Sequence, residues 1–178
     1  MYAMKIYLIG YMGSGKTTIG KLLAEKLHLA FIDLDKHIEQ ETDKPITEIF
    51  EKEGEEKFRI LEHEHLKKLL DKDNVVISLG GGTPCFHNNL ELINKSGTSI
   101  YIEMNADALV KRLLNTKNKR PLIRDLNEVD LKYFIEVNLE KRLPIYRQAH
   151  LSVSAENLPV EQLVEIIGKS VKKNNSKK

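Results

Sequence analysis

The residues best suited to chemistry stand together near the start of the chain, in the stretch LIGYMGSGKTTIG (residues 8–20). It matches the pattern G-x-x-x-x-G-K-[ST], with Gly10, Gly15, Lys16 and Thr17 at the fixed positions. In such a loop, backbone N–H groups surround phosphates, and glycine lets the backbone approach them without a Cβ clash. The pattern predicts that Lys16 reaches the β- and γ-phosphates of a nucleotide and that the Thr17 hydroxyl ligates Mg²⁺. A turn with an incidental lysine is the alternative.

The sequence on either side of this loop supports the phosphate-binding interpretation. The run KIYLI (residues 5–9) is rich in β-branched and aromatic residues, as a buried strand should be. After the loop, Ile19, Leu22, Leu23 and Leu27 recur with the spacing of one helix face. A strand, a glycine loop and a helix in this order direct the free N–H groups of the helix start toward an anion.

Two aspartates follow the second strand-like run, in the sequence FIDLD (residues 31–35). If the strand continues through them, Asp33 and Asp35 share a face because they are two residues apart. In open α/β sheets, ligands bind beyond the carboxyl ends of strands, and phosphoryl transfer uses an acid near the metal. We therefore expect one aspartate near Mg²⁺ and the other near the attacking hydroxyl. A strand-end turn rich in aspartate is the alternative.

Arg59 and Glu62 lie three residues apart on an expected helix, where their side chains can touch. Arginine gives planar, bidentate recognition of a carboxylate, although an exposed pair would be an ion pair of little energetic value. Arg142, at a helix end marked by Pro144, is a second candidate clamp for an anion. The two arginines would suit a substrate that bears a carboxylate.

Three consecutive glycines, Gly80, Gly81 and Gly82, follow the strand-like run VVISL. A glycine run costs backbone entropy and provides no packing. It suits a place where the backbone must approach a ligand closely, and a flexible turn is the alternative.

Three other residues of reactive types are not expected to take part in chemistry. His63 and His65 are two residues apart on an expected helix and so point in different directions, which favours surface histidines over a metal-binding pair. Cys85 has no base at a recognisable spacing and is expected to be structural.

A stretch with dense positive charge and no apolar rhythm runs over residues 115–127 (NTKNKRPLIRDLN) and contains Lys117, Lys119, Arg120 and Arg124. Phosphoryl transfer needs cations on the transferred group, and a closing loop can deliver them and exclude water. We expect a mobile lid at about residues 115–127. Arg120 is our choice for its phosphate-contacting residue because the following proline fixes the local backbone. A solvated basic loop is the alternative.

Strand-like runs alternate with helical runs along the chain, which predicts βαβ units and a parallel sheet covered on both faces. We find no internal repeat, so residues 1–178 are expected to form one domain. The expected strands are Ile6–Ile9, Ala30–Leu34, Val75–Leu79, Ser99–Met104 and Leu151–Ser154, and the expected helices are Lys16–His28, Phe58–Leu70, Ala106–Leu114, Leu131–Leu143 and Val160–Val171.

Composition narrows the function classes. The 178 residues have a formal net charge of only +2, which gives no argument for a nucleic-acid partner. No apolar run approaches the length of a membrane span, and a single cysteine is typical of a reducing cytoplasm. The basic tail at about residues 172–178 is expected to be a solvated, frayed end.

Taken in order, the motifs GYMGSGKTTIG, FIDLD, IFEKEGEEKFR, SLGGGT, KRPLI and EKRLPIY resemble those of the shikimate kinase family over nearly the whole chain. This resemblance implies an α/β fold of the P-loop NTPase class, of nucleoside-monophosphate-kinase type, with a five-stranded parallel sheet of order 2-3-1-4-5 flanked by helices. It also implies a Mg²⁺-dependent kinase that transfers the γ-phosphoryl group of ATP to the 3-hydroxyl of shikimate in aromatic amino-acid biosynthesis. We expect a cytoplasmic monomer whose partners are ATP and shikimate, with no nucleic acid and no membrane.

The same resemblance implies roles for individual residues, and it places a shikimate-binding helical segment at about residues 35–62. The implied catalytic residues are Lys16, Asp35 and Arg120, and the implied metal site is Thr17 with Asp33. The implied ATP-binding residues are Gly13, Ser14, Gly15, Lys16, Thr17, Thr18, Arg112, Arg120 and Asn157. The implied shikimate-binding residues are Asp35, Phe50, Phe58, Arg59, Glu62, Gly80, Gly81, Gly82 and Arg142.

Two other functions stay open at this point. Another kinase of small hydroxyl metabolites, such as a gluconate kinase, need not combine Arg59 and Arg142 with the triple glycine. A nucleotide-binding regulatory module that acts as a guanine-nucleotide switch should show N-K-x-D, and the stretch NKSG (residues 94–97) lacks the final aspartate. A non-catalytic module that binds a shikimate-like molecule would be expected to lose Lys16 or Asp35, and both are present. ADP release with different acceptors separates the three.

Overall fold

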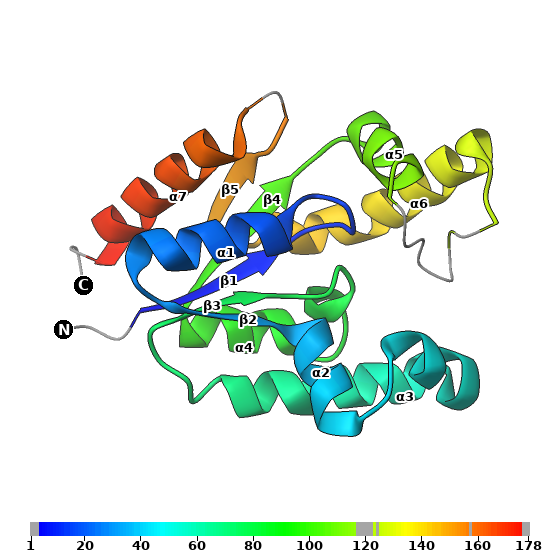
Figure 1. The fold of residues 1–178 in the computed structure, drawn as a ribbon, viewed down its shortest axis with the longest axis horizontal. Helices are drawn as coiled ribbons and strands as arrows, with labels where there is room; N and C mark the ends of the chain where they lie inside the picture. The colour runs from blue at the N-terminus through cyan, green and yellow to red at the C-terminus, as the bar shows by residue number, and fades with distance from the viewer. Residues whose placement is uncertain (1–3, 117–122, 124, 157, 176–178) are drawn as a thin grey trace.

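The computed structural model describes residues 4–116, 123, 125–156 and 158–175, and its centre is a parallel β-sheet (Figure 1). Within these residues, five strands lie in the order β2-β3-β1-β4-β5, and each neighbouring pair is parallel. The expected sheet and its order are therefore confirmed. The strands are β1 (Lys5–Ile9), β2 (Ala30–Asp33), β3 (Val75–Ser78), β4 (Thr98–Glu103) and β5 (Leu151–Ser154).

Helices connect the strands, and the five helices expected from the sequence are all present. Two further helices, at residues 34–42 and 89–96, are not among those expected from apolar periodicity, although the first lies in the helical segment at about residues 35–62 that the family resemblance implies. One expected helix is the second half of a longer one. The helices in the described residues are α1 (Lys16–Leu27), α2 (Leu34–Thr42), α3 (Ile46–Leu69), α4 (Asn89–Ser96), α5 (Ala106–Leu114), α6 (Glu128–Tyr146) and α7 (Val160–Asn175), with a 3₁₀ turn, η1 (Thr83–Cys85), after β3.

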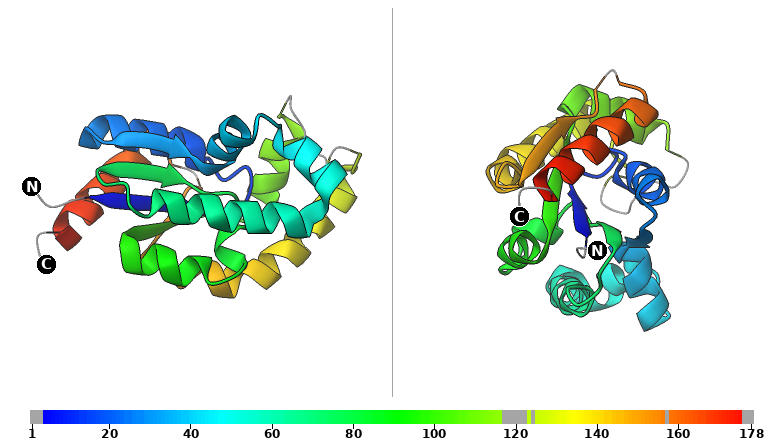
Figure 2. Two further views of the ribbon diagram at one scale, coloured as in Figure 1. Left: turned by 90° about the horizontal axis from the view of Figure 1, so that it is seen from below. Right: turned by 90° about the vertical axis from the view of Figure 1, so that its left-hand side faces the viewer.

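The hydrophobic core has two parts, one on each face of the sheet, because successive strand side chains point to opposite faces. Ile6 and Leu8 of β1 pack into the part that α1 and α7 cover. Tyr7 and Ile9 pack into the part that α3 and α4 cover. All four side chains are fully buried, and Figures 1 and 2 show the helices on the two faces. The loop after β1 turns at the carboxyl end of this central strand, with α5 and α6 on one side and α2 and α3 on the other (Figure 1).

The conditional expectation that Asp33 and Asp35 share a strand face is wrong. Strand β2 ends at Asp33, and α2 begins at Leu34, so Asp35 lies in the first turn of a helix. The Asp33 side chain accepts a hydrogen bond from the backbone N–H of Lys36 over 3.4 Å and caps α2. Aspartate is a favoured N-cap because its carboxylate satisfies a helix N–H that has no partner within the helix.

Helix α3 is longer than the helix expected over Phe58–Leu70, because a second helical part precedes a kink at Gly54. Its backbone at Gly54 has φ 84° and ψ 168°, which is not helical. The residues on either side continue as helix, from Ile46 before the kink to Leu69 after it. Glycine accepts this positive φ without the strain that a side chain would impose. The kink gives the first part of α3 a different direction from the part that holds Arg59.

Proline does not end α6 at the position expected from the sequence. Pro144 lies inside the helix, which continues to Tyr146. Proline removes one backbone donor from a helix, but later bonds can still form. Here the N–H of Arg147 donates to the oxygen of Leu143 over 3.0 Å. Arg142 is therefore held within the last turns of a helix.

Some expectations concern the ends and the lid. Lys172 and Lys173 are exposed, as expected, but they belong to α7 rather than to a frayed tail; residues 176–178 lie outside the described part. Most of the expected lid, including Arg120, also lies outside it, and the described ends of that stretch are Asn115 after α5 and Asn127, which caps α6. Among the described residues, no helix is both long enough and apolar enough to span a membrane.

Candidate active site

The glycine loop between β1 and α1 has the backbone geometry that its sequence predicts. Gly10, Gly13 and Gly15 have φ values of 142°, 82° and 93°, all in the region that favours glycine. A Cβ atom on Gly10 would lie 2.7 Å from the backbone oxygen of Ile102, too close for any side chain. Gly15 caps α1, so the first N–H groups of the helix point out of the loop.

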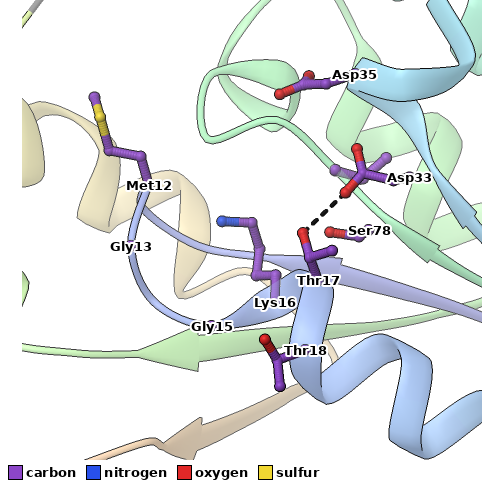
Figure 3. A pocket seen from close by; sticks show the side chains of 10 residues that line it. Met12, Gly13, Gly15, Lys16, Thr17, Thr18, Asp33, Asp35 and Ser78 are labelled. Atoms are coloured by element: carbon purple, nitrogen blue, oxygen red, sulfur yellow. Dashed lines mark hydrogen bonds between the residues drawn. The ribbon is translucent and has the colours of Figure 1, made fainter. Parts of the chain in front are cut away.

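The Lys16 side chain folds back over this loop (Figure 3). Its Nζ atom donates to the backbone oxygens of Gly10 and Tyr11, each over 2.8 Å. The side chain is largely buried, so its charge is held in one place rather than spread over many conformations. Lys16 therefore presents a fixed positive charge beside the free N–H groups of the loop, which is an arrangement that binds phosphate.

A cavity of about 230 Å³ joins the glycine loop to the ends of β2 and β3. The Thr17 hydroxyl donates to Asp33 Oδ2 over 2.8 Å across it (Figure 3). Asp35 lies beside Asp33 at the start of α2. The structure thus brings the nucleotide-loop residues and both aspartates to one cavity. Its lining residues are Met12, Gly13, Gly15, Lys16, Thr17, Thr18, Asp33, Asp35, Ser78 and Leu79.

The Thr17 hydroxyl and the Asp33 carboxylate fit a magnesium ion that is bound together with a nucleotide. They are too few for a metal ion that is coordinated entirely by protein side chains. Both supply oxygen, which Mg²⁺ prefers, and both line the same cavity. In the part of the chain that the structure describes, no three His, Cys, Asp or Glu side chains are grouped so as to hold a metal. Mg²⁺ usually keeps several waters and takes one or two protein ligands together with substrate phosphates.

Arg59 lies in the second part of α3 and is held on two sides by glutamates. Its Nη1 atom donates to Glu62 Oε2 over 2.9 Å, which confirms the expected contact. Its Nε and Nη2 atoms donate to Glu55 Oε1 over 3.2 and 2.9 Å. The Arg59 side chain is 10% exposed and Glu62 only 1%, so this is not the exposed ion pair of the alternative interpretation. The guanidinium also lies 4.3 Å from the ring centre of Phe86.

Phe50 and Phe58 form the rest of the surroundings of Arg59. Their ring centres are 4.6 Å apart, and the Arg59 guanidinium carbon lies 5.9 Å from the first ring and 5.2 Å from the second. Three aromatic rings therefore pack around one cation, which limits its hydration and keeps its planar end directed. Both phenylalanines therefore lie beside Arg59, and their expected contacts with shikimate stay predictions.

Glu62 is an almost fully buried carboxylate. Burial raises its pKa above the usual value, while the charge of Arg59 and a hydrogen bond from Thr83 act in the opposite direction. The Thr83 hydroxyl donates to Glu62 Oε1 over 2.5 Å. Both carboxylate oxygens thus have a protein donor, which is what a buried carboxylate needs to stay charged.

The three glycines after β3 lie directly against these side chains. A Cβ atom on Gly80 would lie 2.7 Å from Glu62 Oε1, and one on Gly82 would lie 2.5 Å from Arg59 Nη1. One on Gly81 would lie 3.5 Å from an Nη1 atom of Arg142. At positions 80 and 82 the need for glycine therefore comes from close approach to the protein's own charged groups, in addition to any ligand, whereas the atoms nearest to a Cβ on Gly81 are backbone atoms of Met12 and Gly10.

Arg142 approaches the glycine run from α6, on the other side from Arg59. Its guanidinium carbon lies 5.3 Å from the ring centre of Tyr11 in the nucleotide loop. The Tyr146 hydroxyl donates to the backbone oxygen of Gly81. Burial raises the pKa of Tyr146, so this hydroxyl keeps its proton at neutral pH. The two arginines thus lie at adjacent glycines of one run, Arg59 at Gly82 and Arg142 at Gly81.

Not every expected site residue is placed in the cavity. Arg112 is exposed, and its Nη1 atom donates to the backbone oxygen of Gly13 over 3.4 Å, so it lies on the outer side of the loop. Ser14 is fully buried within the loop. Arg120 and Asn157 lie outside the described residues, so their expected contacts stay predictions.

The expectation that both histidines of α3 are at the surface is wrong. His65 is 4% exposed and packs edge-on against His37 of α2, with 5.3 Å between ring centres. Burial lowers the pKa of His65, which favours the neutral form. His63 is partly buried and lies 2.6 Å from the side-chain oxygen of Asn89. The buried face of α3 that packs on α2 therefore includes His65 as well as apolar residues.

Sequence reasoning missed several residues that contact the site, among them Thr83 and Phe86. Thr83 could have been noticed as a hydroxyl directly after three glycines, whereas no local signal points to Phe86. Cys85 agrees with its structural interpretation, because burial raises the pKa of its thiol to about 11.

A phosphate-binding loop beside a carboxylate pair, with two arginines around a glycine run, defines a P-loop kinase of a small acidic molecule. The model of the shikimate kinase family matches residues 12–172, and the chain belongs to that family. It is 49% identical over 162 residues to a shikimate kinase of Azobacteroides pseudotrichonymphae, covering 90% of this chain and 95% of that protein.

Solved structures of the family are also close in shape. The crystal structure of a shikimate kinase from Bacteroides thetaiotaomicron has a TM-score of 0.93 and 39% identity, covering 96% of this chain and 99% of that one. A shikimate kinase from Acinetobacter baumannii, solved in complex with shikimate, has a TM-score of 0.89 and 34% identity, covering 97% and 94%.

Proposed function

We propose that this protein transfers the γ-phosphoryl group of ATP to the 3-hydroxyl of shikimate, giving shikimate 3-phosphate and ADP. The observation that supports it best is the single cavity lined by the nucleotide loop and both aspartates, next to the Arg59 and Arg142 pair. In the reaction, the hydroxyl oxygen bonds to the γ-phosphorus as the bond to the β–γ bridging oxygen breaks. The hydroxyl proton leaves to a base, and ADP departs with the bridging oxygen.

On the phosphate side, Lys16 and the N–H groups of the loop stabilise the charge that develops on the transferred group. Preorganised donors of this kind supply much of the catalysis in phosphoryl transfer. Two carbonyls hold the Lys16 ammonium beside the loop, and it exchanges bonds to them for bonds to phosphate oxygens when the nucleotide binds. Arg120 from the lid, and Arg112 with Asn157 on the nucleotide side, remain proposals from the family resemblance.

On the acceptor side, Arg59 and Arg142 bind the carboxylate of shikimate. A charged, bidentate contact from a guanidinium is among the strongest that a protein makes with a carboxylate. Asp35, which lines the cavity next to Asp33, accepts a hydrogen bond from the reacting hydroxyl and is the group placed to take its proton. The glycine run lets the ring of the acceptor come close to the protein backbone.

Mg²⁺ is the metal we propose for this site, with Thr17 and Asp33 as the residues that would hold it. When bound with ATP, Mg²⁺ neutralises charge on the β- and γ-phosphates. The Thr17 hydroxyl now donates to Asp33, and on binding a cation its oxygen would turn toward the metal while Asp33 stays within one water of it. We also propose a monomer in the cytoplasm, where ATP is used and where a single cysteine without a disulfide partner is typical.

The experiment that tests this function is an ADP-release assay with ATP and Mg²⁺ and with shikimate, gluconate or no acceptor. We expect turnover with shikimate, little with gluconate, and only slow hydrolysis without an acceptor. Preference for gluconate would indicate a different small-molecule kinase. Equal rates with and without acceptors would indicate a nucleotide-binding module and overturn the proposal.

A further inference from the structure

A chain of hydrogen bonds continues inward from Arg59 and Glu62 through residues to which the proposed function gives no role. The Thr83 hydroxyl donates to Glu62 Oε1 over 2.5 Å. Asn89 Nδ2 donates to the backbone oxygen of Thr83 over 2.8 Å, and His63 Nδ1 lies 2.6 Å from Asn89 Oδ1. Thr83 and Asn89 are fully buried, so these bonds form away from competing water.

We propose that Thr83, Asn89 and His63 are positioning residues for the acid substrate: they hold Glu62, and Glu62 holds the Arg59 guanidinium. This inference rests on the proposed function, because it takes Arg59 as a group that binds the carboxylate of shikimate. The three residues act through Glu62 rather than by touching the acceptor themselves.

Each bond in the chain has a fixed direction. Asn89 uses its amide nitrogen on Thr83, so its oxygen is the acceptor toward His63, and the Nδ1 atom of His63 carries the proton. The bond from Asn89 fixes the backbone of the η1 turn at Thr83. A threonine hydroxyl has one proton, and here it is given to Glu62. The result is a donor aimed at one oxygen of a buried carboxylate.

Glu62 depends on this donor because it is 1% exposed. Its other oxygen accepts from Arg59 over 2.9 Å, so Arg59 and Thr83 each donate to a different carboxylate oxygen of Glu62. A buried carboxylate oxygen that loses its donor is costly, and the group then turns toward another donor or takes up a proton. Either change weakens the bond by which Glu62 holds Arg59.

Glu55 cannot replace Glu62 in holding Arg59 firmly. Its side chain is 56% exposed, and it bonds to Arg59 four residues away along the same helix. Exposed ion pairs of this kind are weak because solvent screens them and both side chains stay mobile. Glu62 is therefore the rigid anchor, and what fixes Glu62 fixes the direction of the guanidinium.

The decisive variants are Thr83→Val, which removes the hydroxyl and keeps the volume, and Thr83→Ser, which keeps the hydroxyl. We would measure kcat and KM for shikimate and for ATP by ADP release. Thr83→Val should raise the KM for shikimate roughly ten- to a hundredfold, as expected for a hydrogen bond to a charged group, and leave the KM for ATP unchanged. Thr83→Ser should behave as the wild type. Asn89→Ala should raise the KM for shikimate by a smaller factor.

Ser99 provides a matched control, because its substitution also removes a buried hydroxyl but does so away from the site. Ser99 is also fully buried, and its Oγ atom donates to Asn94 over 2.6 Å and lies 3.1 Å from His150 Nδ1. It lies near the start of β4, at the opposite end of the sheet from the site. Ser99→Ala should lower the thermal unfolding midpoint about as much as Thr83→Val, while the KM for shikimate stays at the wild-type value.

A double-mutant cycle tests whether the effect passes through Arg59. In a variant that already carries Arg59→Ala, the further change Thr83→Val should raise the KM for shikimate little. The guanidinium that Thr83 helps to position through Glu62 is then absent. The inference is overturned if folded Thr83→Val and Asn89→Ala bind shikimate as the wild type does, or if their effects add fully to that of Arg59→Ala. A wild-type protein that does not phosphorylate shikimate at all would instead overturn the proposed function, and this inference with it.

Discussion

A single methyl group added at Gly82 would test whether the position of Arg59 decides how well the acceptor binds. The Gly82 backbone has φ −86° and ψ −24°, a conformation that alanine adopts freely. The change Gly82→Ala therefore introduces no backbone strain. Its one direct consequence is a new Cβ atom beside the Arg59 guanidinium.

The size of the effect follows from the distances. The new Cβ would lie 2.5, 2.6 and 2.7 Å from Nη1, Nη2 and Cζ of Arg59, all far inside van der Waals contact. The guanidinium must therefore move by about 1 Å to reach an ordinary separation. Because it is the end of a side chain, it can move without a shift of the backbone, but the move weakens its bonds to Glu62 and Glu55. A misplacement of about 1 Å can cost on the order of a hundredfold, and losing a charged contact costs about ten- to a hundredfold.

The assay is steady-state ADP release with shikimate and ATP varied in turn, together with a thermal unfolding curve. We expect Gly82→Ala to raise the KM for shikimate roughly ten- to a hundredfold, with an unchanged KM for ATP and a similar unfolding midpoint. Gly168→Ala is the control, since its Cβ would have no neighbour nearer than 3.9 Å and it lies in α7. A folded Gly82→Ala variant with a normal KM for shikimate would refute the role given to Arg59.

Three further predictions concern single residues. Lys16→Ala should lower kcat by about a hundredfold or more with the fold intact by circular dichroism, and near-normal turnover would contradict its role. Asp33→Asn should raise the Mg²⁺ concentration for half-maximal rate, and Asp35→Asn should raise the KM for shikimate and lower kcat; the reverse pattern would exchange their roles. Burial raises the pKa of Cys85 to about 11, so at pH 8 about a thousandth of the thiol is ionised. Iodoacetamide should therefore label it much more slowly in the native protein than in denaturant, as mass spectrometry would show.

The sheet and the nucleotide loop could be predicted from the sequence because their signals are local. Strand β3, for example, is a run of four fully buried residues, and such a run has few other structures open to it. The loop from Gly10 to Thr17 is a contiguous pattern whose function depends on its own backbone. In both cases the residues that determine the structure are neighbours in the chain.

The unexpected helices have weak local signals for identifiable reasons. Helix α2 has nine residues, and only Leu34 and Ile38 are buried, so it shows too little apolar rhythm to be recognised. The sequence also predicts a strand that continues to Leu34, which is the residue where α2 begins. In α3 the kink at Gly54 breaks the helical period, so the first part appears irregular in the sequence.

The acceptor half of the site was less predictable because its contacts join distant parts of the chain. Thr83 and Glu62 are 21 residues apart, and the bond between them depends on how η1 packs against α3. The resemblance to a known family indicated Arg59 and Glu62 as binding residues. It assigned no role to Thr83, although Thr83 ends the SLGGGT motif, nor to Asn89 or Phe86, since their contribution is visible only when the side chains are placed in space.

This difference between the two halves has a consequence for how substitutions combine. The phosphate-binding residues lie within one loop and hold their geometry through nearby backbone, so a change there should act alone. In the acceptor half, Thr83, Glu62 and Arg59 share partners, so a change in one alters what the others contribute. Thr83→Val and Asp33→Asn should therefore combine additively in free energy, as distant sites with no shared partner do. Thr83→Val and Arg59→Ala should not, and a measured sum of the two single effects would show that Arg59 is positioned without help from Thr83.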